Sequence, residues 1–553
     1  MTSIRTTNRL RRALVTVLLG LFFLSITCGL HYYRGDAVKQ FSDFNDESSH
    51  FLTGVLIRDY ALHGLPGNPL RFAKDFYLHY PKIAFGSWPP LFHMVLGAWM
   101  LVLPATRFSA ILLVNVTTAV FGVTAAIVAR RLFAAPVAAA VGLAAMLAPI
   151  TQQWDGIIQA DTLYAVFSVA CAYCFAAWLA DGNRGSLCFF SLTFLAALAT
   201  KNNALFLGIT LPSMVLLTRK FGILRRKDIW LALLPGVVFC GVWQYFTLPF
   251  VRNNLLHDTT LAESVVGYLD QTVHLAWIGF LPFILWSVGK RIAMPVLRGQ
   301  AVAAWDAASI GVVAGAYLFH AALPHSVNGR YLLPALVALL LFTAQALEDL
   351  FAMAAWRQLP GGARTVAIAV LLVAPEALGA FSVAPELPYG YAGLAQQIEE
   401  QCPAAHCPSI LISASFGAEG MMVAELAVRE RRPGHYLIRA TKILQERAGA
   451  NNHQRELVHG DPRQMEQYFE ELPIRLVVIS DDGDTEPAAT HDALNSIIQQ
   501  NRAAWDKIMT VPVGGRCSGA SCMVDVYQLK NAAARADFSP QKLPAGTGLW
   551  TQK

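Results

Sequence analysis

The stretch SDFNDESSHFLTGVLIRDYALHG (42–64) decides how the rest of this sequence is organised. It follows the first apolar segment and opens a long polar loop, which continues through YLHYPKIAFGSWPPLFHM (77–94). Two adjacent acids, Asp46 and Glu47, therefore stand shortly after a predicted membrane span. A carboxylate in such a place meets water but lies beside lipid, where an ionisable group is costly and calls for a reason.

The composition is that of a membrane protein with many spans. Of the 553 residues, 55% are hydrophobic and 14% are charged, which is too apolar for an ordinary soluble enzyme. The formal net charge of +6 fits basic residues in inner loops. No run of Lys and Arg carries interleaved aromatic residues, so we expect no nucleic-acid partner. The N-terminal apolar run is long and lacks a cleavage site, which predicts an uncleaved first span.

Hydropathy predicts about eleven spans, because each crossing needs roughly 20 apolar residues. Placing the basic N-terminus in the cytoplasm puts RKFGILRRK (219–227) and the other most basic loops inside, as the positive-inside rule requires. The run PPLFHMVLGAWMLVLP (89–104) is short for a span and would invert that pattern, so we expect an interfacial or re-entrant helix there. The predicted spans are 13–31, 107–129, 134–150, 162–180, 186–200, 203–218, 229–249, 273–289, 305–322, 331–347 and 365–384.

The sequence divides into residues 1–384, with the first outer loop at 32–106, and a polar tail at 385–553. The tail alternates short β-rich runs with helical stretches such as AEGMMVAELAVRERR (418–432), which predicts a compact α/β domain. Four cysteines lie in the tail, and their spacing permits Cys402–Cys407 and Cys517–Cys522 disulfides as well as cross-pairing. The expected strands are ILIS (410–413), HYLIR (435–439), RLVVIS (475–480) and MVDVYQL (523–529).

Acids near the predicted outer face are the first candidates for chemistry. Asp46 and Glu47 follow the first span, and Asp155 and Asp161 precede the fourth. A carboxylate at such a position can accept the proton of an attacking hydroxyl. The structural alternative is that Asp46 caps a helix that begins near Ser48.

Basic residues on the same side form the second group of candidates. Lys201, Arg330, Lys82 and Arg58 could bind a lipid phosphate and stabilise the charge that develops as it leaves. The alternative is that they extend toward lipid head groups. Lys201 and Arg330 stand out because the positive-inside rule disfavours basic residues in outer loops.

Five motifs in order along residues 10–384 resemble glycosyltransferases of the GT-C class that use polyprenyl-phosphate sugars. This superfamily includes the protein O-mannosyltransferases and the lipid A aminoarabinose transferase. The motifs are FNDESSHFLTGVLIRDY (44–60), WPPLFHMVLG (88–97), QADTLYAVF (159–167), ATKNNALFLG (199–208) and GRYLLPALVALL (329–340). They are similar to the family's first-loop Asp-Glu motif, Pro-Pro-Leu helix, Asp at a span start, Lys-containing turn and Arg-Tyr-Leu-x-Pro span.

The resemblance implies roles for these residues. Asp46 would be the catalytic base, Glu47 and Asp161 would orient the acceptor or the sugar, and Lys201 and Arg330 would hold the donor phosphate. Tyr331 and Trp88 belong to the same motifs and join the predicted substrate-binding residues. Trp88 stands where the family has Lys or His, so the identity of the sugar does not follow from the resemblance.

No cofactor is required by these patterns, although a divalent metal is left open. The run DDGD (481–484) looks like a metal-binding Asp-x-Asp, but acidic turns after strands are common. The histidines near the outer face, at positions 50, 93, 257, 274, 320 and 325, have no diagnostic spacing, so we expect no metal site among them.

These observations favour a multi-pass enzyme of the bacterial inner membrane, with a cytoplasmic N-terminus and a periplasmic C-terminal domain. It would transfer a sugar, with inversion, from a polyprenyl-phosphate donor to a lipid, glycan or protein acceptor. A donor carried by lipid suits an outward-facing site, because nucleotide sugars are made in the cytoplasm. The main alternative is a transporter or lipid flippase, although no repeated halves are evident. A third reading is a sensor whose tail binds a ligand.

Overall fold

The computed structural model divides into two compact units, which are described separately. The first consists of residues 1–37, 86–92 and 111–384, and the second of residues 38–85, 93–110 and 385–553. The structure describes residues 2–36, 40–84, 86–252, 260–323, 327–353, 358–384, 389–448, 454–457, 464, 467, 472–481, 488–514 and 522–530.

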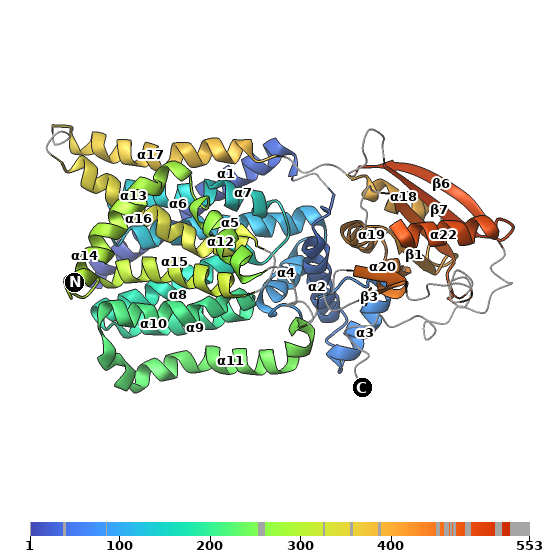
Figure 1. Ribbon diagram of the computed structural model, residues 1–553, viewed down its shortest axis with the longest axis horizontal. Helices are drawn as coiled ribbons and strands as arrows, with labels where there is room; N and C mark the ends of the chain where they lie inside the picture. The colour runs from blue at the N-terminus through green and yellow to red at the C-terminus, as the bar shows by residue number, and fades with distance from the viewer. Residues whose placement is uncertain are drawn as a thin grey trace. The chain divides into compact units, whose positions relative to one another are not determined.

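The first unit is helical (Figure 1). Its α-helices pack in pairs such as α8 on α9 and α10 on α15, and bury Val, Leu, Phe and Ala side chains between them. They are α1 (Thr2–Arg34), α5 (Arg107–Ala129), α6 (Ala135–Leu147), α7 (Pro149–Asp155), α8 (Asp161–Asp181), α9 (Arg184–Thr200), α10 (Leu207–Thr218), α11 (Lys227–Arg252), α12 (Leu261–Val273), α13 (Leu281–Val288), α14 (Met294–Leu297), α15 (Ala304–Ala322), α16 (Leu333–Phe351) and α17 (Gly361–Ser382). Shorter turns are η2 (Asn202–Phe206), η3 (Phe221–Arg225), η4 (Ile278–Phe280), η5 (Gly289–Ala293) and η6 (Gly329–Leu332).

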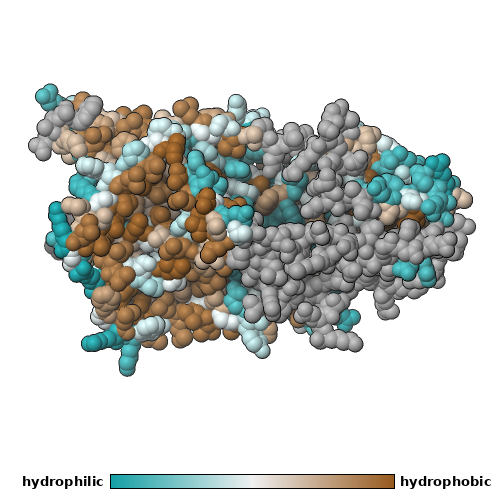
Figure 2. Space-filling model, viewed as in Figure 1, coloured by the Kyte–Doolittle hydropathy of each residue, from teal (hydrophilic) through white to brown (hydrophobic). Residues whose placement is uncertain are grey.

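The outer surface of this unit is suited to lipid. Leu21 on α1, Leu231 on α11 and Leu378 on α17 expose 55%, 66% and 73% of their areas. Figure 2 shows the visible face of the helices covered mainly by apolar residues. Among the described residues, seven helices are long and apolar enough to cross a membrane, or eight with one bent pair. The protein is therefore a polytopic helical membrane protein.

All eleven predicted spans overlap helices, although the one predicted at 273–289 begins in the turn at 274–277. Their number as separate crossings is not confirmed. Within the described part of the chain, α4 (Leu91–Val102), α9, and η2 with α10 are apolar but have fewer than 18 residues. The span predicted over 134–150 is bent, since α6 ends at Leu147 and α7 turns away from it by 53°. Pro149 starts α7, and proline cannot continue the hydrogen bonds of a preceding helix.

The second unit contains an α/β domain built from the tail. Its strands are β1 (Ser409–Ser413), β2 (Tyr436–Arg439), β3 (Gln445–Ala448), β4 (Gln454–Leu457), β5 (Leu476–Asp481), β6 (Trp505–Val513) and β7 (Cys522–Leu529). The main sheet has the order β2-β1-β5-β7-β6, with β2, β1 and β5 parallel and β7 and β6 antiparallel. Strands β3 and β4 form a separate antiparallel pair. The helices are α18 (Tyr391–Gln401), α19 (Phe416–Arg429), α20 (Ala440–Ile443) and α22 (Ala488–Gln500).

All four expected strands are present, and the helix predicted at 418–432 is α19. Strand β6 was not predicted, because Asp506, Lys507 and Pro512 interrupt its apolar pattern. It lies at the edge of the sheet, where a missing backbone donor is tolerated. Of the pairings that the spacing permits, the Cys402–Cys407 disulfide is formed. Cys517 and residues 482–484 of the DDGD run lie outside the described residues.

The first loop belongs mainly to this second unit. It contributes α2 (Asn45–Leu62), α3 (Pro69–His79) and most of α4. The compact units therefore do not follow the sequence division at residue 385, since 38–85 and 93–110 group with the tail. Helix α4 has 12 residues, about 18 Å at 1.5 Å per residue, which is shorter than a bilayer core of roughly 30 Å.

Candidate functional site

The first unit brings together four of the predicted substrate-binding residues. Asp161 is the first residue of α8, Lys201 follows α9, and Arg330 and Tyr331 lie in η6. Lys201 Nζ is 2.5 Å from Asp161 Oδ1 and 4.8 Å from the centre of the Tyr331 ring. Arg330 Nη2 donates to the Tyr331 hydroxyl over 3.2 Å. The motifs that carry these residues are far apart in sequence and meet at one place in the fold.

Two further residues hold Arg330 and were not predicted. Arg330 Nη1 donates to Gln159 Oε1 over 2.9 Å, and its guanidinium carbon lies 5.0 Å from the Trp154 ring. The Gln159 amide in turn donates to the Trp154 carbonyl over 2.8 Å. Gln159 is the first residue of the QADTLYAVF motif. Its amide, two positions before Asp161, was the feature of the sequence that could have identified it. No feature of the sequence identified Trp154, because its position beside Arg330 depends on the bend before α7.

His320 extends the same cluster. Its ring stacks on Tyr331 with centres 5.3 Å apart and planes inclined by 24°. The sequence suggested it only as one of several histidines near the outer face. Position 320 ends a predicted span, and only the packing of α15 on η6 brings it to Tyr331.

The charges of this cluster favour an anion. Lys201 and Arg330 are 4% and 6% exposed, and Asp161 pairs with Lys201. Arg can bind a phosphate with two parallel hydrogen bonds, and Lys binds it as a point charge. Asp161 is fully buried, and its Oδ2 has no hydrogen-bond partner among the described residues. This oxygen can therefore accept a hydrogen bond from a hydroxyl group of a bound molecule.

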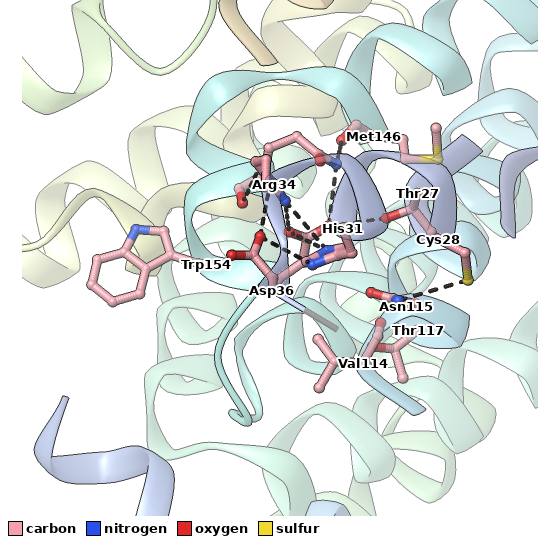
Figure 3. A network of polar contacts seen from close by, with 12 residues as sticks. Thr27, Cys28, His31, Arg34, Asp36, Val114, Asn115, Thr117, Met146 and Trp154 are labelled. Atoms are coloured by element: carbon pink, nitrogen blue, oxygen red, sulfur yellow. Dashed lines mark hydrogen bonds and ion pairs between the residues drawn. The ribbon is translucent and has the colours of Figure 1, made fainter. Parts of the chain in front are cut away.

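Asp155 occupies a different environment, at the end of α7. Its Oδ1 is 3.0 Å from His31 Nε2, and its Oδ2 accepts from Thr27 and Gln152 over 3.2 and 3.1 Å. Figure 3 shows His31 and Arg34 of α1 converging with Asp36. Arg34 Nε is 2.9 Å from Asp36 Oδ2. A carboxylate held by this many partners is a structural anchor between α1 and α7, which disfavours the general-base role considered for Asp155.

The second unit contains Asp46 and Glu47, which differ sharply. Helix α2 begins at Asn45 with Phe44 as its N-cap, so the alternative in which Asp46 caps a helix starting near Ser48 is wrong. Asp46 instead lies in the first turn of α2 and is partly exposed. A carboxylate there is stabilised by the positive end of the helix dipole.

Glu47 is fully buried and serves as an anchor. Its Oε2 accepts from the Ser42 backbone N–H over 2.6 Å and from the Ser42 hydroxyl over 2.7 Å. Its Oε1 accepts from Arg107 Nε over 2.9 Å. Phe44, the N-cap, has no side-chain oxygen to offer, and these contacts order the chain that enters α2.

Lys82 and Arg58 are both engaged within the second unit. Lys82 is 5% exposed and donates to Asn45 Oδ1 and to the Phe416 carbonyl. Burial, reinforced by the charge of Arg439, lowers the pKa of Lys82. Arg58 Nη1 donates to Asp59 over 2.7 Å and Nε donates to the Met100 carbonyl over 2.8 Å. Arg58 lies about 18 Å along α2 from Asp46, so the helix does not bring these two together.

Trp88 lies in the first unit, three residues before α4, with its side chain partly exposed. Among the described residues, no three His, Cys, Asp or Glu side chains are grouped as metal ligands. His257 and His325 lie outside the described part of the chain.

Comparisons with known proteins extend these observations to the fold. No protein-family model matches the sequence, and no curated protein matches it. The structure is similar to ArnT from Cupriavidus metallidurans bound to undecaprenyl phosphate, with a TM-score of 0.58 and 17% identity over 92% of this chain and 97% of that chain. The apo form of ArnT gives a TM-score of 0.56 at 16% identity.

A second similar structure is the oligosaccharyltransferase of Archaeoglobus fulgidus tethered to an acceptor peptide. Its TM-score is 0.54 at 12% identity, over 84% of this chain and 69% of that chain. These likenesses confirm the resemblance drawn from the five motifs at the level of the fold. The chain has the GT-C fold, as a polytopic helical membrane protein with a small C-terminal α/β domain.

Proposed function

We propose that this protein is a membrane glycosyltransferase that moves a sugar from a polyprenyl-phosphate donor to a lipid, glycan or protein acceptor. The observation that carries the proposal is the buried cluster of Lys201, Arg330, Asp161 and Tyr331 in the first unit. The similar ArnT structure was solved with undecaprenyl phosphate bound. A cluster of two buried cations suits the phosphate of such a lipid.

The reaction is a single displacement at the anomeric carbon. Asp46 takes the proton from the acceptor hydroxyl, and the acceptor oxygen forms a bond to that carbon. The bond from the carbon to the phosphate oxygen breaks, and the electron pair leaves on the polyprenyl phosphate, which gains one negative charge. Lys201 and Arg330 stabilise that charge as it develops. One displacement inverts the configuration of the sugar.

Asp161, Tyr331 and Trp88 have binding roles in this proposal. The buried Asp161 both orients Lys201 and offers its Oδ2 to a sugar hydroxyl. Tyr331 faces Lys201 with its ring and Arg330 with its hydroxyl. Trp88 provides an apolar surface against which a sugar ring can stack.

We further propose that the reaction takes place at the periplasmic face of a bacterial inner membrane. The positive-inside rule supports this orientation through the basic loops of the first unit. The Cys402–Cys407 disulfide supports it from the second unit, because such bonds persist in oxidising compartments.

The substitution Asp46→Asn tests the base directly. We expect transfer to fall by about 10²–10⁴-fold, since the amide cannot accept the proton. Asp75→Asn is the matched control, because Asp75 is an exposed acid on α3 of the same loop. The donor is first identified by mass spectrometry of envelope lipids and glycans from cells with and without the protein. Transfer is then followed in membranes that contain equal amounts of each variant.

A wild-type rate for Asp46→Asn would remove Asp46 from the proposed mechanism. Accumulation of a lipid or solute in vesicles without any covalent product would instead favour a transporter or flippase.

A further inference from the structure

The start of α19 packs against the start of α2 within the second unit. The ammonium of Lys82 joins them, because it donates to Asn45 at the start of α2 and, over 3.2 Å, to the Phe416 carbonyl of α19. The C-terminal domain thus contacts the turn that carries Asp46.

Two glycines make this approach close. A Cβ added at Gly420 would lie 2.5 Å from Ser48 Oγ and 2.9 Å from Lys82 Cε. A Cβ added at Gly417 would overlap the carbonyl oxygen of Asp43. A side chain at Gly417 would have to displace the backbone at Asp43, and one at Gly420 would have to displace the Ser48 and Lys82 side chains.

The contact lies where α/β domains commonly bind ligands. Helix α19 follows the carboxyl end of β1, which is paired with β2 on one side and β5 on the other. Such an edge, where the strand order changes direction, is the usual ligand site in open α/β sheets. At the start of α19 the Asp43 carbonyl and the Lys82 side chain are in contact with the helix. This disfavours a sensor that binds a ligand at the start of α19.

Further contacts hold the chain on both sides of Asp46. The Phe41 backbone N–H donates to Glu425 Oε1 of α19 over 3.3 Å. Glu47 is fixed by Ser42 and Arg107, as described above. The chain is therefore anchored both before and after Asp46.

We propose that α19 is a positioning element for the proposed base, in which Gly417, Gly420 and Lys82 hold the first turn of α2 and so aim the Asp46 carboxylate. This inference rests on the proposed function of Asp46. It assigns the C-terminal domain to the transfer reaction and gives Lys82 a role in positioning rather than in binding phosphate. A displacement of about 1 Å in a reacting group can lower a rate by 10²-fold.

The test compares Gly420→Ala with Gly393→Ala in the full-length protein. Gly393 lies in α18 of the same domain, and an added Cβ there meets nothing within 4 Å. We expect Gly420→Ala to lower the maximal rate by about tenfold or more. The apparent KM for a polyprenyl-phosphate-sugar extract of cell membranes should stay within about twofold, because the proposed phosphate contacts are made by residues of the first unit. Hydrogen exchange should accelerate in residues 41–50.

A second substitution distinguishes positioning from general damage. Ser48→Ala removes the oxygen nearest the new methyl group, so Gly420→Ala with Ser48→Ala should recover much of the rate and protection lost by Gly420→Ala alone. Gly417→Ala should not be recovered by Ser48→Ala, because its obstacle is the Asp43 backbone. If Gly420→Ala fails to accumulate in membranes, Lys82→Met provides the same exchange test, with exposed Lys74→Met as control.

Unchanged exchange at 41–50 and an unchanged rate in Gly420→Ala or Lys82→Met would overturn the positioning role. Equal losses in Gly420→Ala and in its combination with Ser48→Ala would also overturn it. Wild-type transfer by Asp46→Asn would overturn the proposed function instead, while the exchange data would still report whether α19 holds α2.

Discussion

Acidic residues that are close together in this sequence differ in burial and in hydrogen bonding. Asp46 is partly exposed in the first turn of α2, whereas Glu47 is fully buried against Ser42 and Arg107. Asp155 and Asp161 show the same contrast, because Asp155 is bonded to residues of α1 and Asp161 retains an oxygen without a described partner. At the scale of single residues, exposure distinguishes Asp46 from Glu47, and an oxygen without a described partner distinguishes Asp161 from Asp155.

The cation that we assign to the donor phosphate can be tested by binding alone. We expect Lys201→Met to weaken binding of undecaprenyl phosphate by roughly 10–100-fold, the worth of one hydrogen bond to a charged group. The dissociation constants of the purified wild type and variant, measured by tryptophan fluorescence or calorimetry, give the change in affinity.

Lys290→Met is the matched control for this measurement. Lys290 also pairs with a carboxylate, Asp349, but its side chain is 53% exposed on a predicted inner loop. Equal affinity of Lys201→Met and the wild type would contradict the assignment of Lys201.

Among the elements, the short helix α7 links two clusters. It places Asp155 against His31 and Arg34 of α1, and Trp154 over Arg330 of η6. The 53° bend before Pro149 makes both contacts available from seven residues. The contacts of Asp155 with His31 and Arg34 should therefore also keep the Trp154 ring in position against Arg330.

Removing the central carboxylate of that cluster should be severe. Asp155→Ala leaves His31 and Arg34 with Asp36 as their remaining described carboxylate partner, and breaking a buried pair typically costs about 3–5 kcal/mol. We expect a large fall in thermal stability of the purified protein. Asp270→Ala removes an exposed His–Asp pair on α12 and should change stability by less than about 1 kcal/mol. Similar melting temperatures for the two variants would refute the anchoring role.

The contact between the end of α3 and the tail should become less stable at low pH. His79 Nδ1 donates to the Gly434 and His435 carbonyls over 2.9 and 3.2 Å. Burial lowers the pKa of His79, and this outweighs the two carbonyl hydrogen bonds and the nearby Glu430 and Asp75 carboxylates, all of which raise it. The detached form then binds a proton more readily than the attached form. The stability of this contact is therefore lost as the pH falls from about 6.5 through the lowered pKa.

Hydrogen exchange in residues 69–84 reports this sensitivity. Lowering the pH from about 7.5 to about 5.5 should increase local opening, after correction for the intrinsic exchange rate, and His79→Phe should reduce that increase. His274→Phe, at the exposed histidine that follows α12, should leave the increase unchanged. An identical pH response in His79→Phe and the wild type would argue against His79.

At the scale of the whole molecule, the first loop and the tail belong to one compact unit although residues 111–384 separate them. Phe41 and Glu425 are bonded across 384 positions, and Asp59 and Arg432 across 373. Loop and tail must then lie on the same side of the membrane. This agrees with an odd number of crossings between the N-terminus and the tail.

Reporter fusions test this orientation. We expect alkaline phosphatase fused after Lys553 to be active and green fluorescent protein fused there to be dark, because both report a periplasmic position. The same reporters fused after Asp181, in a predicted inner loop, should give the opposite result. A fluorescent fusion after Lys553 would reverse the proposed topology and would conflict with the Cys402–Cys407 disulfide.

Much of the architecture was open to prediction because its signals are local. Every span predicted from runs of apolar residues overlaps a helix, and β-rich runs located β1, β2, β5 and β7. The motif residues Asp161, Lys201, Arg330 and Tyr331 were identified before their cluster was known. Where polar residues or Pro512 broke the pattern, as in β6, the prediction failed because sheet pairing outweighed local propensity.

The sequence by itself determined a many-span helical protein, an α/β tail, and the residues whose charge makes them candidates for phosphate and proton chemistry. Tertiary structure alone decided that Glu47 and Asp155 are anchors, that Trp154, Gln159 and His320 support the cation cluster, and that the first loop joins the tail. The physical reason is distance along the chain. Hydropathy and turn preferences act within about 20 residues, whereas the burial and pairing of a carboxylate depend on partners such as Thr27, which lies 128 positions from Asp155.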